Sequence, residues 1–259
     1  MKLSHKDAGR GSEHVRFQVQ FKIGELKRKD SMTKQKMIPT LVCGMLGCLC
    51  FGGGDWLMIY GDTSFHADAV SWITNGAAEI PIWRQNLAMA LAFPGIILYG
   101  VALFSVQNYI TDEKRRKVYH YLNAFGLTPW LALHLFYIMI LVLFAQLNGS
   151  AEMTEAARIC GELYSALSWV VIASEAFMLP VFVYWFYLQV RGFTAFPKPF
   201  AFTNVLIFFG LLKGVTMLMP DNAFRLAFTN GLMSESMIIW FAIILIFEIR
   251  REKKDEKRN

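Results

Sequence analysis

Four ionisable residues interrupt long apolar stretches of the sequence and are the side chains best placed to do chemistry: Asp55, Glu175, Lys213 and Glu235. A charge inside lipid hydrocarbon costs about 2.5–3.5 kcal/mol on insertion scales, so such side chains normally face a bundle interior and pair. From a rise of about 1.5 Å per residue, Asp55, Lys213 and Glu235 each fall roughly 7–9 Å below the outer membrane boundary. Glu175 falls deeper, about 20 Å below that boundary. The sequence therefore predicts a polar layer contributed by three helices, with a fourth acid beneath it.

This layer is the candidate ligand- or ion-binding site. Lys213 is its only cation and can neutralise one carboxylate, so the other acids need water, a proton or a ligand. The hypothesis is a polar cavity that opens outward with two arginines at its mouth, and its candidate residues are Asp55, Lys213, Glu235, Glu175, Arg84 and Arg225. A staple that only pairs helices and a catalytic site stay open as alternatives. The excess of acids favours a binding site, because a pure staple needs balanced charge.

The elements that must position these residues are membrane-spanning helices. Hydrophobic residues make up 55% of the 259-residue chain and charged residues 18%, against about 25% charged in soluble domains. The apolar runs do not alternate with polar residues, which argues against a β-barrel. We predict an all-α, polytopic membrane bundle with six transmembrane helices at Met37–Tyr60, Leu87–Tyr109, Leu127–Leu147, Gly161–Gln189, Phe200–Met219 and Asn230–Ile249.

Basic residues indicate the orientation of these spans. Of the 26 lysines and arginines, 22 lie in residues 1–36, 112–121, 191–198 and from 250 onward. These segments fall on one side of a six-span topology, so both termini are predicted in the cytoplasm, with the chain in the plasma membrane. The net charge of +6 is explained by this flanking pattern, and no nucleic-acid partner is expected.

The predicted organisation is a basic cytoplasmic arm (1–36), a transmembrane domain (37–249) and a basic cytoplasmic tail (250–259). The arm contains an alternating stretch at residues 15–23, which alone favours a β-strand but has no partner strand. A further hypothesis is that translation starts at Met32, so that residues 1–31 are not translated natively; the intact mass of the native protein tests it.

Small residues predict one helix contact. Cys43, Gly47, Cys50 and Gly54 form one stripe of the first predicted span, and Gly210 and Gly214 form a GxxxG pattern beside Lys213. Small faces let helices approach closely, so the first and fifth spans are expected to pack together. The connector at residues 62–86 is predicted either to hold a short interfacial helix or to be a solvated loop.

Catalytic and metal motifs are absent from the sequence. The four cysteines have no zinc or redox spacing, and no two histidines share a predicted helix at metal or haem spacing. His134 is interpreted as a core residue of the third span, whose start is predicted at the Thr128–Pro129 pair. No P-loop and no nucleophile elbow occur, so no cofactor is expected and an enzyme is disfavoured without being excluded.

The pattern Gly54-Asp55-Trp56 at the end of the first span resembles uncharacterised bacterial six-span integral membrane proteins, over residues 32–259. The resemblance implies a plasma-membrane location and no established activity. The favoured function is therefore binding of a small polar ligand or ion, in transport or sensing, with the lipid bilayer as surroundings. The alternatives are an intramembrane enzyme acting on a lipid substrate and a structural or accessory membrane protein. The oligomeric state is left open.

Overall fold

The structure of the protein is a computed structural model that describes residues 37–61, 80–148 and 153–257. The chain divides into two compact units, residues 1–39 and residues 40–259, and everything below concerns the second. The predicted arm at 1–36, with its alternating stretch and Met32, lies outside the described residues, as does most of the connector predicted at 62–86.

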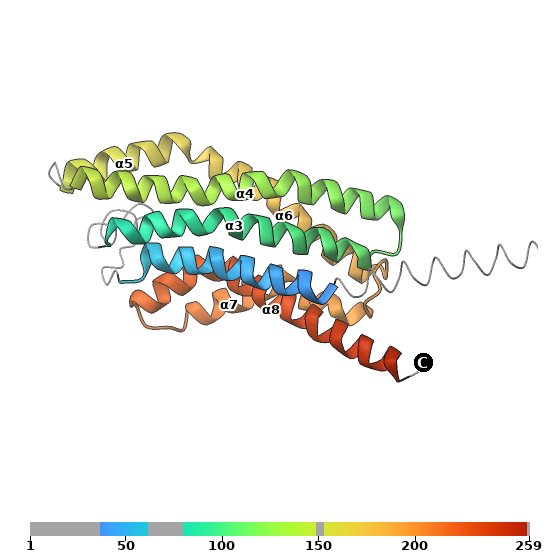
Figure 1. The fold of residues 1–259 in the computed structure, drawn as a ribbon. Coiled ribbons are helices and arrows are strands. Elements are labelled where there is room, and N and C mark those ends of the chain that lie inside the picture. The colour runs from blue at the N-terminus through green and yellow to red at the C-terminus, as the bar shows by residue number, and fades with distance from the viewer. Residues whose placement is uncertain (1–36, 62–79, 149–152, 258–259) are drawn as a thin grey trace, which may run out of the picture. The chain divides into compact units, whose positions relative to one another are not determined.

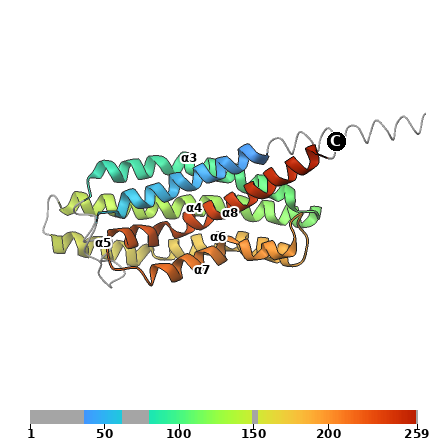
Figure 2. The ribbon, with the colours of Figure 1, turned by 90° about the horizontal axis from the view of Figure 1, so that it is seen from below.

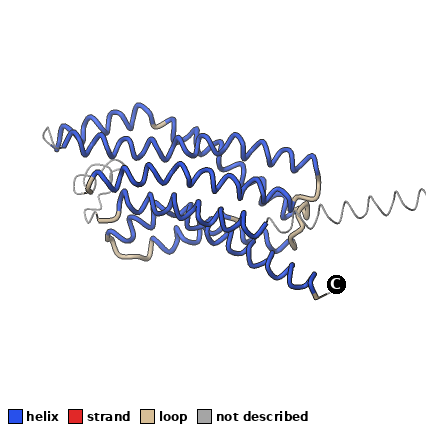
Figure 3. The backbone as a smooth tube through the Cα atoms, in the orientation of Figure 1, coloured by secondary structure: helices blue, strands red, loops and turns tan. Residues whose placement is uncertain are grey.

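Helices account for nearly all of the described residues, and no strand occurs among them (Figure 3). The predicted all-α class is confirmed. The first described helix, called the first helix below, is Met37–Ile59. It is followed by α3 (Ile82–Val106), η1 (Gln107–Tyr109), α4 (Glu113–Asn148), α5 (Met153–Leu167), α6 (Trp169–Val190), η2 (Lys198–Thr203), α7 (Val205–Thr216) and α8 (Ala223–Glu256).

Five stretches of the described chain are long and apolar enough to cross a membrane: Met37–Ile59, Ile82–Tyr109, Glu113–Leu147, Trp169–Val190 and Ala223–Lys254. The fifth predicted span, Phe200–Met219, corresponds to η2 and the 12-residue helix α7. At about 1.5 Å per residue α7 is roughly 18 Å long, short of a hydrocarbon core of about 30 Å. The structure thus fits a multi-pass membrane protein, while six full spans are not confirmed.

Helix packing follows a different pairing from the predicted one. A side chain at Gly47 would place its Cβ 2.7 Å from the backbone nitrogen of Tyr99 and 2.8 Å from the carbonyl oxygen of Gly95, both on α3. Nothing lies within 4 Å of a Cβ built at Gly210 or Gly214. The small stripe of the first helix therefore packs on α3, and the expected contact with the GxxxG face of α7 is wrong.

Two of the predicted spans also differ from the observed helices. The predicted fourth span is interrupted at Ser168, whose hydroxyl donates to the carbonyl of Ser165 at 2.9 Å and separates α5 from α6. The predicted third span lies inside the longer helix α4, which continues through Pro129. Asp112 caps α4 by accepting from the Arg115 amide at 2.8 Å, and that hydrogen bond lowers the pKa of its carboxyl group.

Within residues 40–259, α5 folds back along the end of α4, and α7 lies along α8 (Figures 1 and 2). Helices α3, α4, α6 and α8 share an aromatic core; its largest fully buried side chains include Trp185, Trp240, Tyr99, Tyr119 and Phe182.

Two polar contacts tie one end of this unit together. The hydroxyl of Tyr109 donates to Glu248 Oε2 at 2.8 Å, and Arg251 Nη2 donates to Glu248 Oε1 at 2.6 Å. Asn204 caps α7 through the amide of Leu206 and donates its Nδ2 to the carbonyl of Phe182 at 3.0 Å. The predicted tail from residue 250 continues α8 as far as Glu256.

Candidate functional site

A cavity of about 550 Å³ lies between the first helix, α4, α5, α6, α7 and α8. Most of its wall is apolar or aromatic, including Phe51, Trp130, Leu206 and Phe209. A few polar residues interrupt this wall: Asp55, His134, Tyr137, Tyr164, Glu175, Thr229, Asn230 and Ser234. An apolar pocket with a small number of polar groups is the usual form of a small-molecule site.

Asp55 and His134 form the polar centre of one side of the cavity. Nδ1 of His134 lies 3.4 Å from Oδ1 of Asp55, and the two side chains are only 7% and 17% exposed, respectively. The ring of Phe51 packs edge-on against the imidazole at a centroid distance of 4.8 Å. The first helix and α4 are therefore joined through a buried acid–imidazole pair that also faces the cavity.

Sequence reasoning included Asp55 among the site residues but interpreted His134 as a core residue of the third span, because a lone buried histidine is usually one. In the structure α4 begins at Glu113, which places His134 about 31 Å along the helix rather than near the inner end of a span. The cap at Asp112, followed directly by Glu113, was the signal that could have shown the earlier start.

Glu175 brings a second carboxylate to the cavity from α6. It lies near enough to Tyr137 for the two groups to interact electrostatically, and Tyr137 also bonds through its side chain to Tyr164. The rings of these two tyrosines stack at a centroid distance of 6.3 Å. Glu175 is itself exposed, so it stands where the cavity opens.

The cavity wall is acidic. Asp55 and Glu175 are its two carboxylates, and the wall includes no lysine or arginine among the described residues. A cavity with this lining attracts positive charge, because a carboxylate removed from water is stabilised by a nearby cation. Within the described part of the chain, no cluster of three or more His, Cys, Asp or Glu side chains is arranged to hold a metal ion.

Glu235 lies behind the wall rather than in it. Its Oε1 accepts a hydrogen bond from Nε1 of Trp56 at 3.0 Å, and its Oε2 is buried without a hydrogen-bond donor among the described residues. Its charge still acts on Asp55. The predicted proximity of these two acids is therefore present, with Trp56 as a partner that the sequence did not indicate.

Lys213 does not complete the layer as expected. It is half-buried on α7, and no ion pair joins it to Asp55 or Glu235 in the described residues. The predicted Asp55–Lys213 pair is therefore absent there, and His134 occupies the position beside Asp55.

Arg84 and Arg225 terminate helices and do not line the cavity. Arg84 Nη2 donates to the carbonyls of Trp56 and Tyr60 at 3.2 and 2.7 Å, which satisfies carbonyls at the end of the first helix.

Arg225 pairs with Asp221 and donates to the carbonyl of Met219 at 3.3 Å, just before and within the start of α8. The expectation that both arginines form the mouth of the cavity is wrong, because each is committed to a helix terminus.

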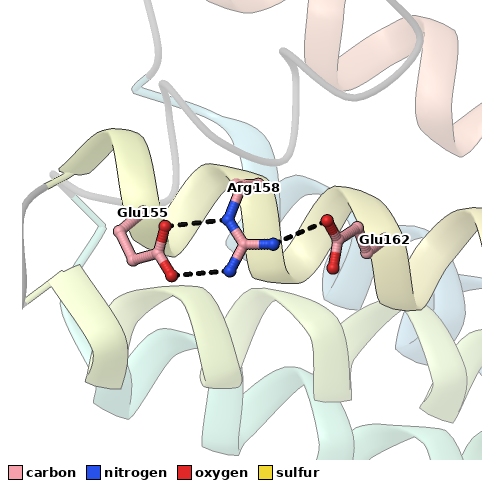
Figure 4. A network of polar contacts seen from close by, with 3 residues as sticks. All are labelled: Glu155, Arg158 and Glu162. Carbon is pink, nitrogen blue, oxygen red and sulfur yellow. Dashed lines mark hydrogen bonds and ion pairs between the residues drawn. The ribbon is translucent and has the colours of Figure 1, made fainter.

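The exposed charges of α5 are arranged differently. Arg158 donates to Glu155 at 2.6 and 2.8 Å and to Glu162 at 2.6 Å (Figure 4). All three side chains are about half exposed or more. The hydrogen bonds from Arg158 lower the pKa of Glu155, and those to both acids raise the pKa of the guanidinium. This is a solvated helix-surface network with no cavity beside it.

Comparison with known proteins places the chain in one family. No curated protein and no solved structure matches the chain. Residues 32–251 match a protein family described as a family of unknown function, DUF6796. The match covers most of the chain and includes every residue of the cavity wall. The protein is therefore a member of DUF6796, a family of unknown function.

Proposed function

We propose that the protein is an integral membrane protein that binds a small, positively charged polar ligand or ion in the cavity, in transport or sensing. The observation that carries the proposal is the pair of carboxylates, Asp55 and Glu175, in one cavity whose described wall has no lysine or arginine. A purely structural acid in a membrane bundle is expected to lie against a fixed cation, and neither acid has a lysine or arginine beside it in the described wall, where Asp55 contacts the imidazole of His134.

The aromatic wall supports an organic cation over a bare metal ion. Trp130, Tyr137 and Tyr164 line the cavity together with Phe51, and aromatic faces attract ammonium groups within about 6 Å. The described residues also lack a metal-binding cluster, whereas a quaternary ammonium needs only negative charge and aromatic faces.

The membrane setting of this function is part of the proposal. The basic segments support a plasma-membrane protein with the arm at 1–36 and the tail at 250–259 in the cytoplasm. The polar cavity then opens toward the outer side. Thiol labelling of single cysteines placed in each connector, from either side of sealed vesicles, tests this orientation.

Binding of radiolabelled tetramethylammonium to the purified protein tests the ligand class. We expect saturable binding that weakens at least tenfold in Asp55→Asn and in Glu175→Gln, since each variant removes a charge from the cavity. Glu162→Gln is the matched control, because Glu162 is 67% exposed on α5 and lies outside the cavity wall. Unchanged binding in Asp55→Asn contradicts the proposal.

The competing function is structural. The contact between Asp55 and His134 joins two helices, which is the observation that favours a staple. In that case Asp55→Asn lowers the melting temperature, and tetramethylammonium does not raise the melting temperature of the wild-type protein. Uptake by proteoliposomes then separates transport from sensing, because only a transporter moves the bound cation across the bilayer.

A further inference from the structure

The cavity has a side wall formed by α6 and α7, and these two helices are fixed together at one level. There Nδ2 of Asn204, the residue preceding α7, donates to the carbonyl of Phe182 on α6 at 3.0 Å. Asn204 is 1% exposed, so this contact is a buried clamp at the closed end of the wall.

Beyond the clamp the cavity reaches the surface of the protein, because its wall residues Glu175 and Leu179 on α6 are exposed. Gly210 lies six residues after Asn204 and Glu175 lies seven residues before Phe182, so each is about 9–10 Å from the clamp along its helix. A Cβ at Gly210 would meet nothing within 4 Å, and Glu175 is exposed. Gly210 is one helical turn from Leu206, a residue of the cavity wall, so an exposed position of α7 adjoins that wall.

This opening faces the membrane. It lies along α6, which is long and apolar enough to span a bilayer, and its borders are the apolar residues Leu179, Leu206 and Phe209. Leu211 and Val215, farther along α7, are 61% and 45% exposed, as expected for side chains in contact with lipid. A route between α6 and α7 therefore gives the acidic cavity a lateral opening to the hydrocarbon, besides its opening toward the outer side.

We infer that the ligand is a cationic amphiphile, with an ammonium head near Asp55 and Glu175 and an alkyl chain in the gap between α6 and α7. This inference rests on the proposed function and adds the class of ligand and its route. Charge complementarity selects the head, and the apolar borders of the gap select the chain. A small hydrophilic cation that enters from water is the alternative.

Competition against radiolabelled tetramethylammonium, with the protein in lipid nanodiscs, tests the inference. The two competitors, octyltrimethylammonium and unlabelled tetramethylammonium, share a trimethylammonium head. The first has an octyl chain where the second has a methyl group. Burial of each methylene strengthens binding by up to about fourfold, so we expect octyltrimethylammonium to compete at least tenfold better. Gly210→Leu fills the gap and is expected to remove that advantage while leaving tetramethylammonium binding unchanged. Gly214→Leu, one turn farther along α7, is a second variant with the same expected result.

Gly53→Leu is the matched control, because Gly53 also has nothing within 4 Å of its Cβ and is not part of the cavity wall. It should retain the preference for the octyl chain. Equal competition by the two cations, or a Gly210→Leu variant that weakens both alike, overturns the lateral route and leaves cation binding intact. Failure of tetramethylammonium to bind the wild-type protein overturns the proposed function, and this inference with it.

Discussion

Glu248 and Asp55 are both carboxylates inside the helix bundle, but their surroundings differ. Glu248 is fully buried and each of its oxygens accepts a hydrogen bond, one from Tyr109 and one from the cation Arg251. Asp55 faces a cavity and lies beside His134, and the negative charge of Glu235 also acts on it. The same protein therefore contains a carboxylate paired with a guanidinium, Glu248, and a carboxylate whose basic neighbour is only an imidazole, Asp55.

The difference shows what a structural acid looks like in this chain. A buried ion pair whose members are both hydrogen-bonded is a fixed connection between segments, and its carboxylate already has a cation as its partner. The cavity acids keep acceptors facing open space, which is costly unless a cation or proton fills it. We therefore assign stability to the Glu248 cluster and binding to the Asp55 cavity.

Loss of the base should have the largest effect on stability. Arg251→Met leaves Glu248 buried beside Tyr109 without its cation, and we expect a loss of about 2 kcal/mol or more in the free energy of unfolding. Lys213→Met is the contrasting variant and should change stability little, because no ion pair joins Lys213 to a cavity acid among the described residues. Denaturant unfolding in mild detergent measures both. An equal loss in Lys213→Met would show that Lys213 is a hidden counter-ion.

Neutralising each acid should have opposite consequences. Glu248→Gln weakens two hydrogen bonds to a charged acceptor and should destabilise the protein by about 1–2 kcal/mol. Asp55→Asn removes a charge that has no lysine or arginine beside it in the described cavity wall, so its stability should be equal to or greater than wild type while tetramethylammonium binding is lost. Melting temperature and binding, measured on the same samples, separate the two outcomes. Destabilisation by Asp55→Asn without a change in binding would reverse the assignment.

The sequence predicted much of the helical architecture because spanning helices are marked by length and apolarity, which are local properties. It also selected Asp55 and Glu175 as site residues, since charges inside spans rarely face lipid, and both line one cavity in the structure. The roles of Arg84 and Arg225 were not predictable in this way. Both bind backbone carbonyls at helix ends, and a carbonyl is present at every residue, so nothing in the sequence marks the partner.

Helix partners were harder to predict than helices. The glycine stripe around Gly47 correctly indicated a close contact, but a small face does not specify which helix fills it. The Gly210 and Gly214 pattern has the same composition and has open space beside it. Only the arrangement of α3 and α7 separates these two cases.

The hydrogen bond from Trp56 to Glu235 provides a smaller test of the acid-rich region. Trp56→Phe removes a neutral donor, 3.0 Å from Oε1, from a carboxyl group whose other oxygen has no donor among the described residues. We expect a loss of about 1 kcal/mol, and less when Glu235→Leu is already present, because either change removes the same hydrogen bond. A double-mutant cycle of unfolding free energies measures that coupling. Additive losses would show that Trp56 acts through packing alone.

The smallest effect is expected on the surface of α5. Arg158→Ala breaks the ion pairs with Glu155 and Glu162, yet all of these groups are solvated, so the melting temperature should change by less than about 2 °C. The hydrogen bonds from Arg158 lower the pKa of Glu155 in the folded protein. Their contribution is therefore present above the ordinary carboxyl pKa of the unfolded chain and disappears as the pH falls through the lowered value. Melting curves of wild type and Arg158→Ala should differ slightly near neutral pH and coincide in acid. A large difference at neutral pH would show that balanced charges on this exposed helix also hold the fold, which would weaken the distinction between paired and unpaired acids on which the cavity assignment rests.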